Sequence, residues 1–277
     1  MHYAYDVLRS EFVISMDMFL QENIRLITFF LSSAFFFFLE SYRPLRSLKE
    51  NRWQHLLKNA SIAFVNALIY GLFFTTAINL VTNFTTEHTF GVFQWLELPV
   101  VFEFSLSFLA LDFILYLWHV AAHKVPFIWK FHLVHHVDSD MDFSTGTRFH
   151  LGEMIGIILF HLPFYWILGI SLEALIIYQV LLILFDQFGH ANYRVPAGID
   201  RVLRWVFVTS NYHRVHHSDH VKELNSNYGT VFSIWDRIWK TYNPRKDLGS
   251  LTMGIKGYPK ILSWWALNKL PFMKKQP

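Results

Sequence analysis

Residues 118–136 read WHVAAHKVPFIWKFHLVHH and contain two histidine clusters. The spacing is i, i+4 in the first cluster and i, i+3, i+4 in the second. Positions three and four residues apart share one face of an α-helix, so each cluster directs its imidazoles to one side of a helix. The histidines concerned are His119, His123, His132, His135 and His136.

Further histidines extend this pattern toward the C-terminus. YHRVHH at 212–217 repeats the i, i+3, i+4 spacing, and DQFGH at 186–190 ends in a single histidine. Packed imidazoles without a metal lose hydration or, once protonated, repel each other, and there are far more of them than one structural zinc needs. The sequence therefore predicts that separate helices bring these rings together around two metal ions. The predicted ligands are His119, His123, His132, His135, His136, His190, His213, His216 and His217.

The composition indicates an integral membrane protein. Hydrophobic residues make up 53% of the 277 residues and charged residues 16%, with a mean hydropathy of +0.28, whereas a soluble domain is about 25% charged. Apolar stretches lie at about 24–39, 60–81, 100–118 and 155–185. The last is too long for one span of about 20 residues. Because Gly169, Ser171 and Glu173 interrupt it, we expect a helical hairpin with halves of about 15 residues, short for full crossings.

Loop charges predict how these segments are oriented. The 41–59 loop contains several Lys and Arg residues, whereas 82–99 contains none. The positive-inside rule places the 41–59 loop in the cytoplasm, so every histidine cluster lies on the cytoplasmic face, at the membrane edge. Lys274 and Lys275 form either a basic membrane-flanking tail or a pattern that resembles a retrieval signal of the endoplasmic reticulum. We expect a bacterial inner membrane or the endoplasmic reticulum.

Residue usage also excludes several classes of protein. The chain has no cysteine, which excludes disulfides, iron–sulfur clusters, thiolate zinc sites and a cysteine nucleophile. The net charge is only +3 and no long basic block is present, so nucleic acid is not an expected partner. Residues 1–23 mix charged and apolar side chains and predict no cleavable signal peptide.

The expected fold is an all-α integral membrane helical bundle with about four to five membrane-embedded segments. A cytoplasmic helical cap is expected to hold the histidine-rich dinuclear metal site. We divide the chain into an N-terminal transmembrane region at 1–111, a catalytic region at 112–243 that includes the membrane hairpin at 154–187, and a C-terminal tail at 244–277.

Histidines outside the clusters have a simpler interpretation. Hydrogen-bonded core positions are expected for His2, His55, His88 and His161, while His150 and His220 are left open between ligand, supporting and surface roles. Metal-bound histidines usually donate their other ring N–H to a carboxylate or carbonyl. The carboxylates considered for this role are Asp112, Asp138, Asp142, Asp186, Asp219 and Asp236.

The identity of the metal follows from the ligand set. Imidazole suits zinc, copper, iron and nickel. A hydrolytic zinc site needs three ligands, an open position and a general base, and this chain has no H-E-x-x-H motif. An all-histidine pair beside a bilayer fits iron that activates O₂ for attack on a lipid C–H bond. A non-redox zinc-dependent membrane hydrolase, or a transporter whose histidine relay includes Glu103 and Asp112, remains an alternative.

The boxes WHVAAH, FHLVHH and YHRVHH, with NSNYGTVFSIWDRIWKTY at 225–242, resemble the fatty acid hydroxylase superfamily, also called the sterol desaturase superfamily. The resemblance covers residues 112–243. It implies a non-haem di-iron enzyme that uses O₂ and external electrons to hydroxylate or desaturate an acyl lipid, sterol or ether lipid.

Within the superfamily, YHRVHH and the following stretch resemble the alkylglycerol monooxygenase branch. This second resemblance implies cleavage of ether lipids with tetrahydropterin. No His-Pro-Gly-Gly motif is present, so no fused cytochrome b5 domain is expected. The electrons would then come from a separate redox partner, which would be cytochrome b5, a ferredoxin or tetrahydropterin.

Overall fold

The computed structural model describes residues 18–245 and 247–273, and these residues contain helices but no β-strand. The all-α prediction is confirmed for this part of the chain. The expectations for His2, for residues 1–17 and for the dilysine pattern lie outside the described residues. The elements are α2 (Met18–Tyr42), α3 (Arg52–Ile69), the π-helical η1 (Tyr70–Phe74), α4 (Thr75–Glu87), α5 (Val92–Trp95), α6 (Val100–Lys124), α7 (Pro126–His136), η2 (Phe143–Thr147), α8 (Leu151–Leu168), α9 (Leu172–His190), α10 (Ala197–Leu203), α11 (Ser210–His216), α12 (Val221–Leu224), α13 (Ile234–Ile238), α14 (Trp264–Lys269) and η3 (Leu270–Phe272).

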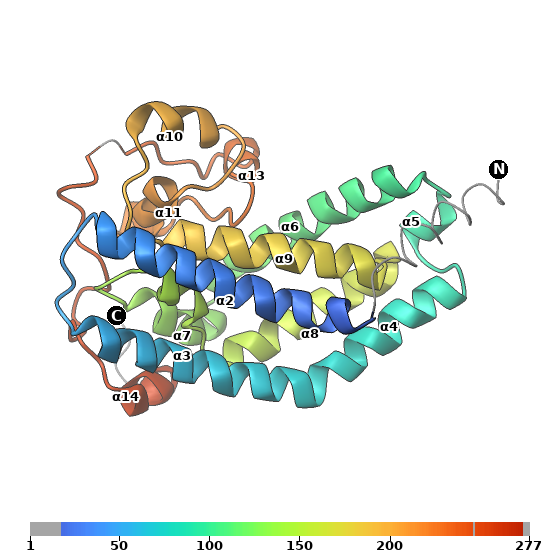
Figure 1. Ribbon diagram of the computed structural model, residues 1–277, viewed down its shortest axis with the longest axis horizontal. Coiled ribbons are helices and arrows are strands. Elements are labelled where there is room, and N and C mark those ends of the chain that lie inside the picture. Colours follow the sequence, from blue (N-terminus) through green and yellow to red (C-terminus); the bar gives the residue numbers. More distant parts are fainter. Residues whose placement is uncertain (1–17, 246, 274–277) are drawn as a thin grey trace.

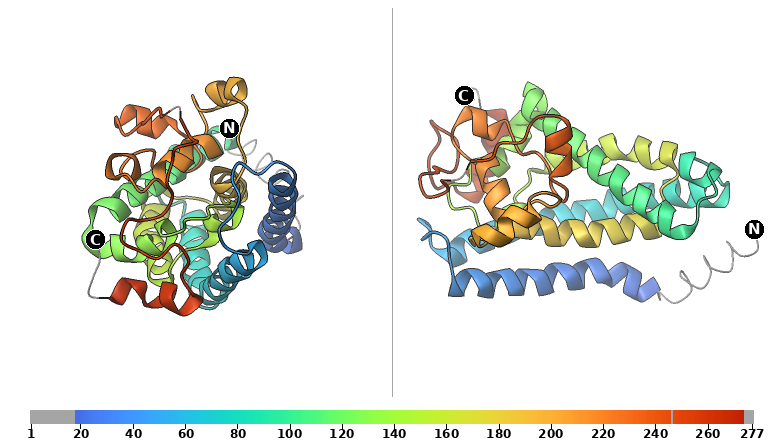
Figure 2. Two further views of the ribbon diagram at one scale, coloured as in Figure 1. Left: turned by 90° about the vertical axis from the view of Figure 1, so that its left-hand side faces the viewer. Right: turned by 90° about the horizontal axis from the view of Figure 1, so that it is seen from above.

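The long helices form an elongated bundle, and most of the short helices gather at one end of it, which is called the cap below (Figure 1, Figure 2). Large apolar side chains cover the outside of the long helices; Phe30, Leu31 and Phe38 on α2 are 65%, 67% and 69% exposed. An apolar exterior of this extent suits lipid rather than water. The segments long and apolar enough to cross a membrane are Asn23–Tyr42, Arg52–Trp95, Val100–Lys124, Leu151–Leu168 and Leu172–His190.

The predicted hairpin is present as α8 and α9. The chain reverses at Gly169, whose φ of +70° is left-handed, and a Cβ there would lie 2.6 Å from the carbonyl oxygen of Phe90. Glycine therefore fits this turn both by its backbone angle and by the space available. The two halves have 18 and 19 residues, and at 1.5 Å per residue each is about 27 Å long or slightly more. The expected short halves were wrong because both helices continue past the apolar run.

The second apolar stretch extends further than the predicted 60–81. α3, η1 and α4 follow one another without a break, and the single π-helical turn of η1 lies between the two α-helices. The helix begins directly after Asn51, whose side chain accepts hydrogen bonds from the backbone N–H groups of Trp53 and Gln54. The Asn51 side chain thus satisfies backbone donors that have no partner inside the helix. With this N-cap, α3 begins eight residues before the predicted apolar stretch.

α6 and α7 form a continuous path from the bundle into the cap. α6 contacts both α8 and α9 and continues to Lys124, beyond the predicted 100–118. Pro126 then occupies the first turn of α7, where its missing N–H and fixed φ are tolerated. The break at Val125 reverses the chain, so that the histidines at the end of α6 face those of α7.

Buried polar side chains tie the cap to the spans. His55 on α3 is fully buried and lies 3.0 Å from a carboxylate oxygen of Asp138 and 3.1 Å from one of Asp142. Both acidic residues belong to the loop that follows α7. Buried polar groups need such partners because unpaired ones are costly. The network therefore fixes the loop after α7 against α3.

The remaining histidine expectations have mixed outcomes. His55 and His161 are hydrogen-bonded and buried, as predicted; Nδ1 of His161 lies 2.7 Å from the carbonyl oxygen of Ile157. His88 is exposed, so its assignment to the core was wrong. It lies at the C-terminal end of α4, where the helix reaches the surface and Nδ1 contacts the carbonyl oxygen of Phe84.

Candidate metal centre

The nine histidines selected by the sequence pattern lie in two compact groups, contributed by α6, α7, α9 and α11 with the residue that follows it. Within each group, one ring nitrogen of every member lies within 4.8 Å of the others, and all members except His123 are buried. The five-histidine group consists of His119, His123, His132, His136 and His216. The four-histidine group consists of His135, His190, His213 and His217.

The two groups adjoin each other because neighbouring residues contribute to different groups. His135 and His136 on α7 belong to separate groups, and so do His216 and His217 at the end of α11. The rings of His136 and His217 stack with their centroids 4.4 Å apart. The arrangement is therefore two adjoining groups of histidines, each of which could hold a metal ion.

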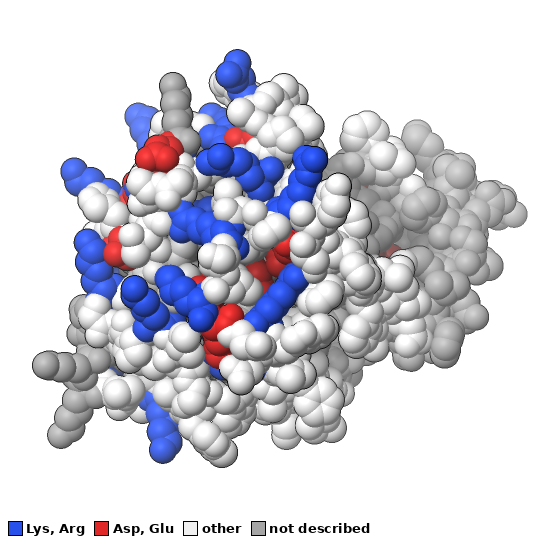
Figure 3. Space-filling view, turned by 60° about the vertical axis from the view of Figure 1, so that its left-hand side comes forward, with Lys and Arg blue, Asp and Glu red and all other residues white. Residues whose placement is uncertain are grey.

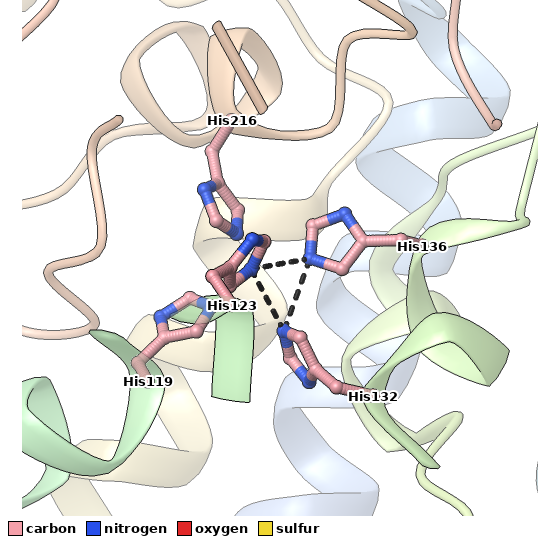
Figure 4. Close-up of side chains that lie close together, drawn as sticks. All are labelled: His119, His123, His132, His136 and His216. Atoms are coloured by element: carbon pink, nitrogen blue, oxygen red, sulfur yellow. Dashed lines mark hydrogen bonds between the residues drawn. The ribbon is translucent and has the colours of Figure 1, made fainter. Parts of the chain in front are cut away.

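Three members of the five-histidine group form a triangle of ring nitrogens (Figure 4). The Nε2 atoms of His123, His132 and His136 are 3.0–3.1 Å from one another. Two nitrogens bound 90° apart, each about 2.1 Å from one metal, would be separated by about 3.0 Å. The triangle thus has the size of one face of an octahedral coordination shell.

Hydrogen bonds outside the groups determine which nitrogen faces inward. Nδ1 of His119, His190 and His216 each lies 2.7 Å from a backbone carbonyl oxygen. A carbonyl only accepts, so each ring has its proton on Nδ1 and an unprotonated Nε2. Nε2 of His119 and of His216 is buried and has no hydrogen-bond partner among the described residues. Unprotonated, unpaired nitrogens of this kind are suitable metal ligands.

The carboxylate of Glu153 orients the His132 ring in the same way. Glu153 was not among the carboxylates predicted for this role. Its carboxylate oxygen lies 2.6 Å from Nδ1 of His132, and both side chains are buried. A carboxylate that orients a metal-binding histidine is a recurring feature of such sites. The available signal was an acidic residue in the first turn of an apolar hairpin helix, since such residues in membrane segments usually have a function.

Burial keeps the rings neutral. Outside the membrane spans, burial and then the neighbouring rings lower the pKa of His135, His136, His213 and His217 well below the usual histidine range. Burial lowers the pKa of His216 to about 3. A metal can therefore bind these residues at neutral pH without first displacing protons.

The carboxylates of Asp112 and Asp236 accept hydrogen bonds from the loop after α12 and do not contact a histidine ring of either group. Asp112 accepts a hydrogen bond from the backbone N–H of Phe232 (3.1 Å), and Asp236 accepts one from that of Tyr228 (2.8 Å). The carbonyl oxygen of Tyr228 is the partner of Nδ1 of His119. Asp112 was expected to contact His119 directly because both lie on one face of α6; it instead holds the loop that supplies the carbonyl.

The other proposed carboxylates have different partners. Asp186 supports His190 through its backbone carbonyl at 2.7 Å, whereas its carboxylate is 3.5 Å from the same nitrogen. Asp138 and Asp142 contact His55 instead of a member of either group. Asp219 donates its backbone N–H to the carbonyl of Thr252.

The two histidines left open, His150 and His220, belong to neither group. Nδ1 of His150 accepts a hydrogen bond from the backbone N–H of Gly152 at 2.9 Å and so caps α8. His220 is exposed and precedes α12.

Comparison with known proteins identifies the family. Residues 104–241 match the family model described as fatty acid hydroxylase. The chain is 30% identical over 165 residues to an ornithine lipid hydroxylase of Rhizobium tropici, covering 59% of this chain and 48% of that protein. It is 31% identical over 206 residues to an alkylglycerol monooxygenase of Xenopus tropicalis, with 67% and 45% covered. A human cholesterol 25-hydroxylase is 27% identical over 135 residues, with 48% of each chain covered.

Through this domain the chain belongs to the fatty acid hydroxylase family. It matches about half the length of the curated relatives named above. No solved structure matches it significantly. Together with the five apolar helical segments, the family membership identifies a multi-pass membrane protein.

Replacing Glu153 should weaken metal binding. Glu153→Ala removes the partner of His132, and we expect a loss of about 10–100-fold in metal affinity, as is typical of outer-shell partners. Glu153→Gln retains an acceptor and should lose less. The measurement is iron retention by the purified chain against a chelator series. Glu173→Gln, at the opposite end of the hairpin, is the control and should behave as wild type. Wild-type iron retention by a folded Glu153→Ala variant would contradict the supporting role.

Proposed function

We propose that the chain is a membrane-bound di-iron oxygenase that hydroxylates a lipid C–H bond with O₂ and external electrons. The observation behind this proposal is the pair of adjoining all-histidine groups, in which His119, His190 and His216 each present an unprotonated Nε2. Membership of the fatty acid hydroxylase family supports it. The substrate class is an acyl lipid, a sterol or an ether lipid, in keeping with the names of the relatives.

The nine histidines serve as ligands in this proposal, and the rest of the chain positions them. Two iron ions held by the two groups would supply the activation of O₂ for attack on a C–H bond. The carbonyls of Tyr228, Asp186 and Ser226 orient the rings. Burial of the groups excludes bulk water, which limits side reactions.

Two alternatives differ in what the centre would do. Ether-lipid cleavage with tetrahydropterin is favoured by the likeness to alkylglycerol monooxygenases of several animals. A zinc-dependent hydrolase would use three protein ligands and an open position, whereas nine imidazoles converge in this chain. The number of histidines therefore supports either oxygenase reaction better than hydrolysis.

The electrons are proposed to come from a separate donor: cytochrome b5, a ferredoxin or tetrahydropterin. Adding each donor in turn to the purified, iron-loaded chain and measuring O₂ uptake with lipid would identify it. If none of the three supports uptake, this list of donors is wrong.

One ligand variant from each group tests the proposed activity. His135→Ala and His216→Ala should each reduce O₂-dependent lipid turnover more than about 100-fold, since losing a ligand should exceed the 10–100-fold effect of losing an outer partner. His220→Ala is the matched control and should keep wild-type turnover. The assay is mass spectrometry of membrane lipids with and without the expressed variant, on protein shown to be folded by gel filtration. Full turnover by either ligand variant would contradict the assignment.

The same lipid analysis separates the possible reactions. Hydroxylation adds one oxygen atom, desaturation removes two hydrogen atoms, and ether cleavage depletes ether lipids. Lipids that change in none of these ways, combined with tightly bound zinc, would support the hydrolase instead.

We propose that the metal centre faces the cytoplasm. The basic segment 41–59 lies at the cap end of the bundle, whereas segment 82–99, which contains no Lys or Arg, lies at the opposite end. The chain has no cysteine, so single cysteines report accessibility cleanly. In bacterial spheroplasts, a membrane-impermeant maleimide should label Glu87→Cys directly and Lys222→Cys only after permeabilisation; both positions are exposed. The reverse labelling pattern would show the opposite orientation.

A further inference from the structure

A pocket of about 70 Å³ is lined in part by Arg214 and Asn192, which lie one and two residues after members of the four-histidine group. Its walls come from the loop after α2, the loop after α7, the residues just after α9, and α11. Figure 3 shows that Lys and Arg side chains gather over the cap end of the molecule, with a few acidic side chains between them. The charged residues that line the pocket are Arg46, Lys49, Asp140 and Arg214.

Arg214 is the most unusual of these residues. It lies within the YHRVHH box and is only 1% exposed. One guanidinium nitrogen donates to the carbonyl oxygen of Ala191 at 2.6 Å, while Nε is buried without a hydrogen-bond partner among the described residues. No ion pair within the described part of the chain includes Arg214. Glu40 acts on the Arg214 charge through space, but its carboxylate is engaged by Arg52 and by the backbone N–H groups of Phe143 and Asn192. A buried charge without a direct ion-pair partner is costly, so this position favours an anion.

Arg46 and Lys49 add two further positive charges without ion-pair partners in the described structure. The guanidinium of Arg46 donates to the backbone carbonyls of Leu248 and Leu251 and, at 3.4 Å, to that of Gly249, none of which carries a charge. Nζ of Lys49 is 3.4 Å from the carbonyl oxygen of Ser139, a long contact. Both side chains therefore retain capacity to interact with an anion in the pocket.

The nearby carboxylates are already engaged. Asp140, which lines the pocket, accepts hydrogen bonds from the backbone N–H groups of Lys49 (2.7 Å) and Glu50 (2.6 Å). Glu50 itself pairs with Lys58 at 2.6 Å. Glu40, in an adjoining pocket, pairs with Arg52 at 3.3 Å. The charged lining therefore has three cations and one carboxylate, a net charge of two positive.

We propose that this pocket binds a phosphate monoester or free phosphate through Arg46, Lys49 and Arg214. Guanidinium groups recognise oxyanions with paired, charge-assisted hydrogen bonds, and lysine acts as a point charge. A phosphate monoester has a charge of about −1.5 to −2 at neutral pH, which matches the lining better than a phosphodiester or a carboxylate. On the same measure a cavity needs about 10–15 Å³ to hold one water, so this pocket has room for a tetrahedral oxyanion.

The position of Arg214 links this pocket to the candidate metal centre. Arg214 directly follows His213 in α11, and Asn192 in the pocket wall follows His190 by two residues. The Asn192 side chain exchanges hydrogen bonds with the backbone of Arg46 in both directions (2.8 and 3.2 Å). A bound phosphate would therefore join the loop after α2 to the helices that supply the four-histidine group. The expected consequence is a more stable cap, independent of the reaction catalysed.

Phosphate binding can be measured on the full-length purified chain by its thermal unfolding midpoint at constant ionic strength. Inorganic phosphate should raise the midpoint saturably, whereas chloride should not. Lys49→Gln should weaken the apparent affinity about tenfold, the scale of one charge-assisted hydrogen bond. Arg43→Gln, an exposed cation of the same loop that does not line the pocket, is the matched control. Lys49 is exposed, so its replacement should leave folding intact, which Arg214→Gln would put at risk.

A second unfolding experiment, in lipid nanodiscs, distinguishes a lipid headgroup from free phosphate. The chain is reconstituted in phosphatidylcholine nanodiscs with phosphatidic acid or, at equal total charge, phosphatidylglycerol. Stabilisation by phosphatidic acid beyond phosphatidylglycerol, lost in Lys49→Gln, would identify a lipid headgroup; stabilisation by inorganic phosphate alone would identify a free ligand. The proposal is wrong if phosphate and phosphatidic acid stabilise no more than chloride and phosphatidylglycerol, or if Arg43→Gln and Lys49→Gln weaken binding equally.

Discussion

The structure depends on one constraint: ring nitrogens from separate helices converge, and partners outside the two groups orient four of the rings. Rings of His119, His190 and His216 meet it by donating Nδ1–H to backbone carbonyls, and His132 does so with the carboxylate of Glu153. Without a cation, converging lone pairs repel and buried nitrogens stay unpaired. The constraint thus explains why these largely buried groups suit a pair of metal ions.

The scaffold serves this constraint through long-range polar contacts. Asp112 and Asp236 fix the loop whose carbonyl orients His119. At the opposite wall, Asp138 joins the loop after α7 to α3 through His55. Apolar packing also positions α7, since Leu133 and Val134 pack against Leu267 and Leu270.

The fold and the candidate site were predictable where the signal is local. Histidine spacing indicated the faces of α6, α7 and α11, and Gly169 indicated the hairpin turn. The division of His135 and His136 between two groups was not readable, because it depends on how three helices pack. The role of the Tyr228 carbonyl was not predictable either, because every residue has a backbone carbonyl and the sequence does not show which one contacts His119. His88 was misplaced because hydropathy does not show where a helix reaches the surface.

The most direct test of the central claim is the metal content and coordination of the purified, folded chain. Elemental analysis with iron X-ray absorption should give two iron ions per chain, with nitrogen neighbours at about 2.1 Å and the outer-shell scattering of imidazole rings. One metal ion or none per folded chain, or a first shell without imidazole, would contradict the account.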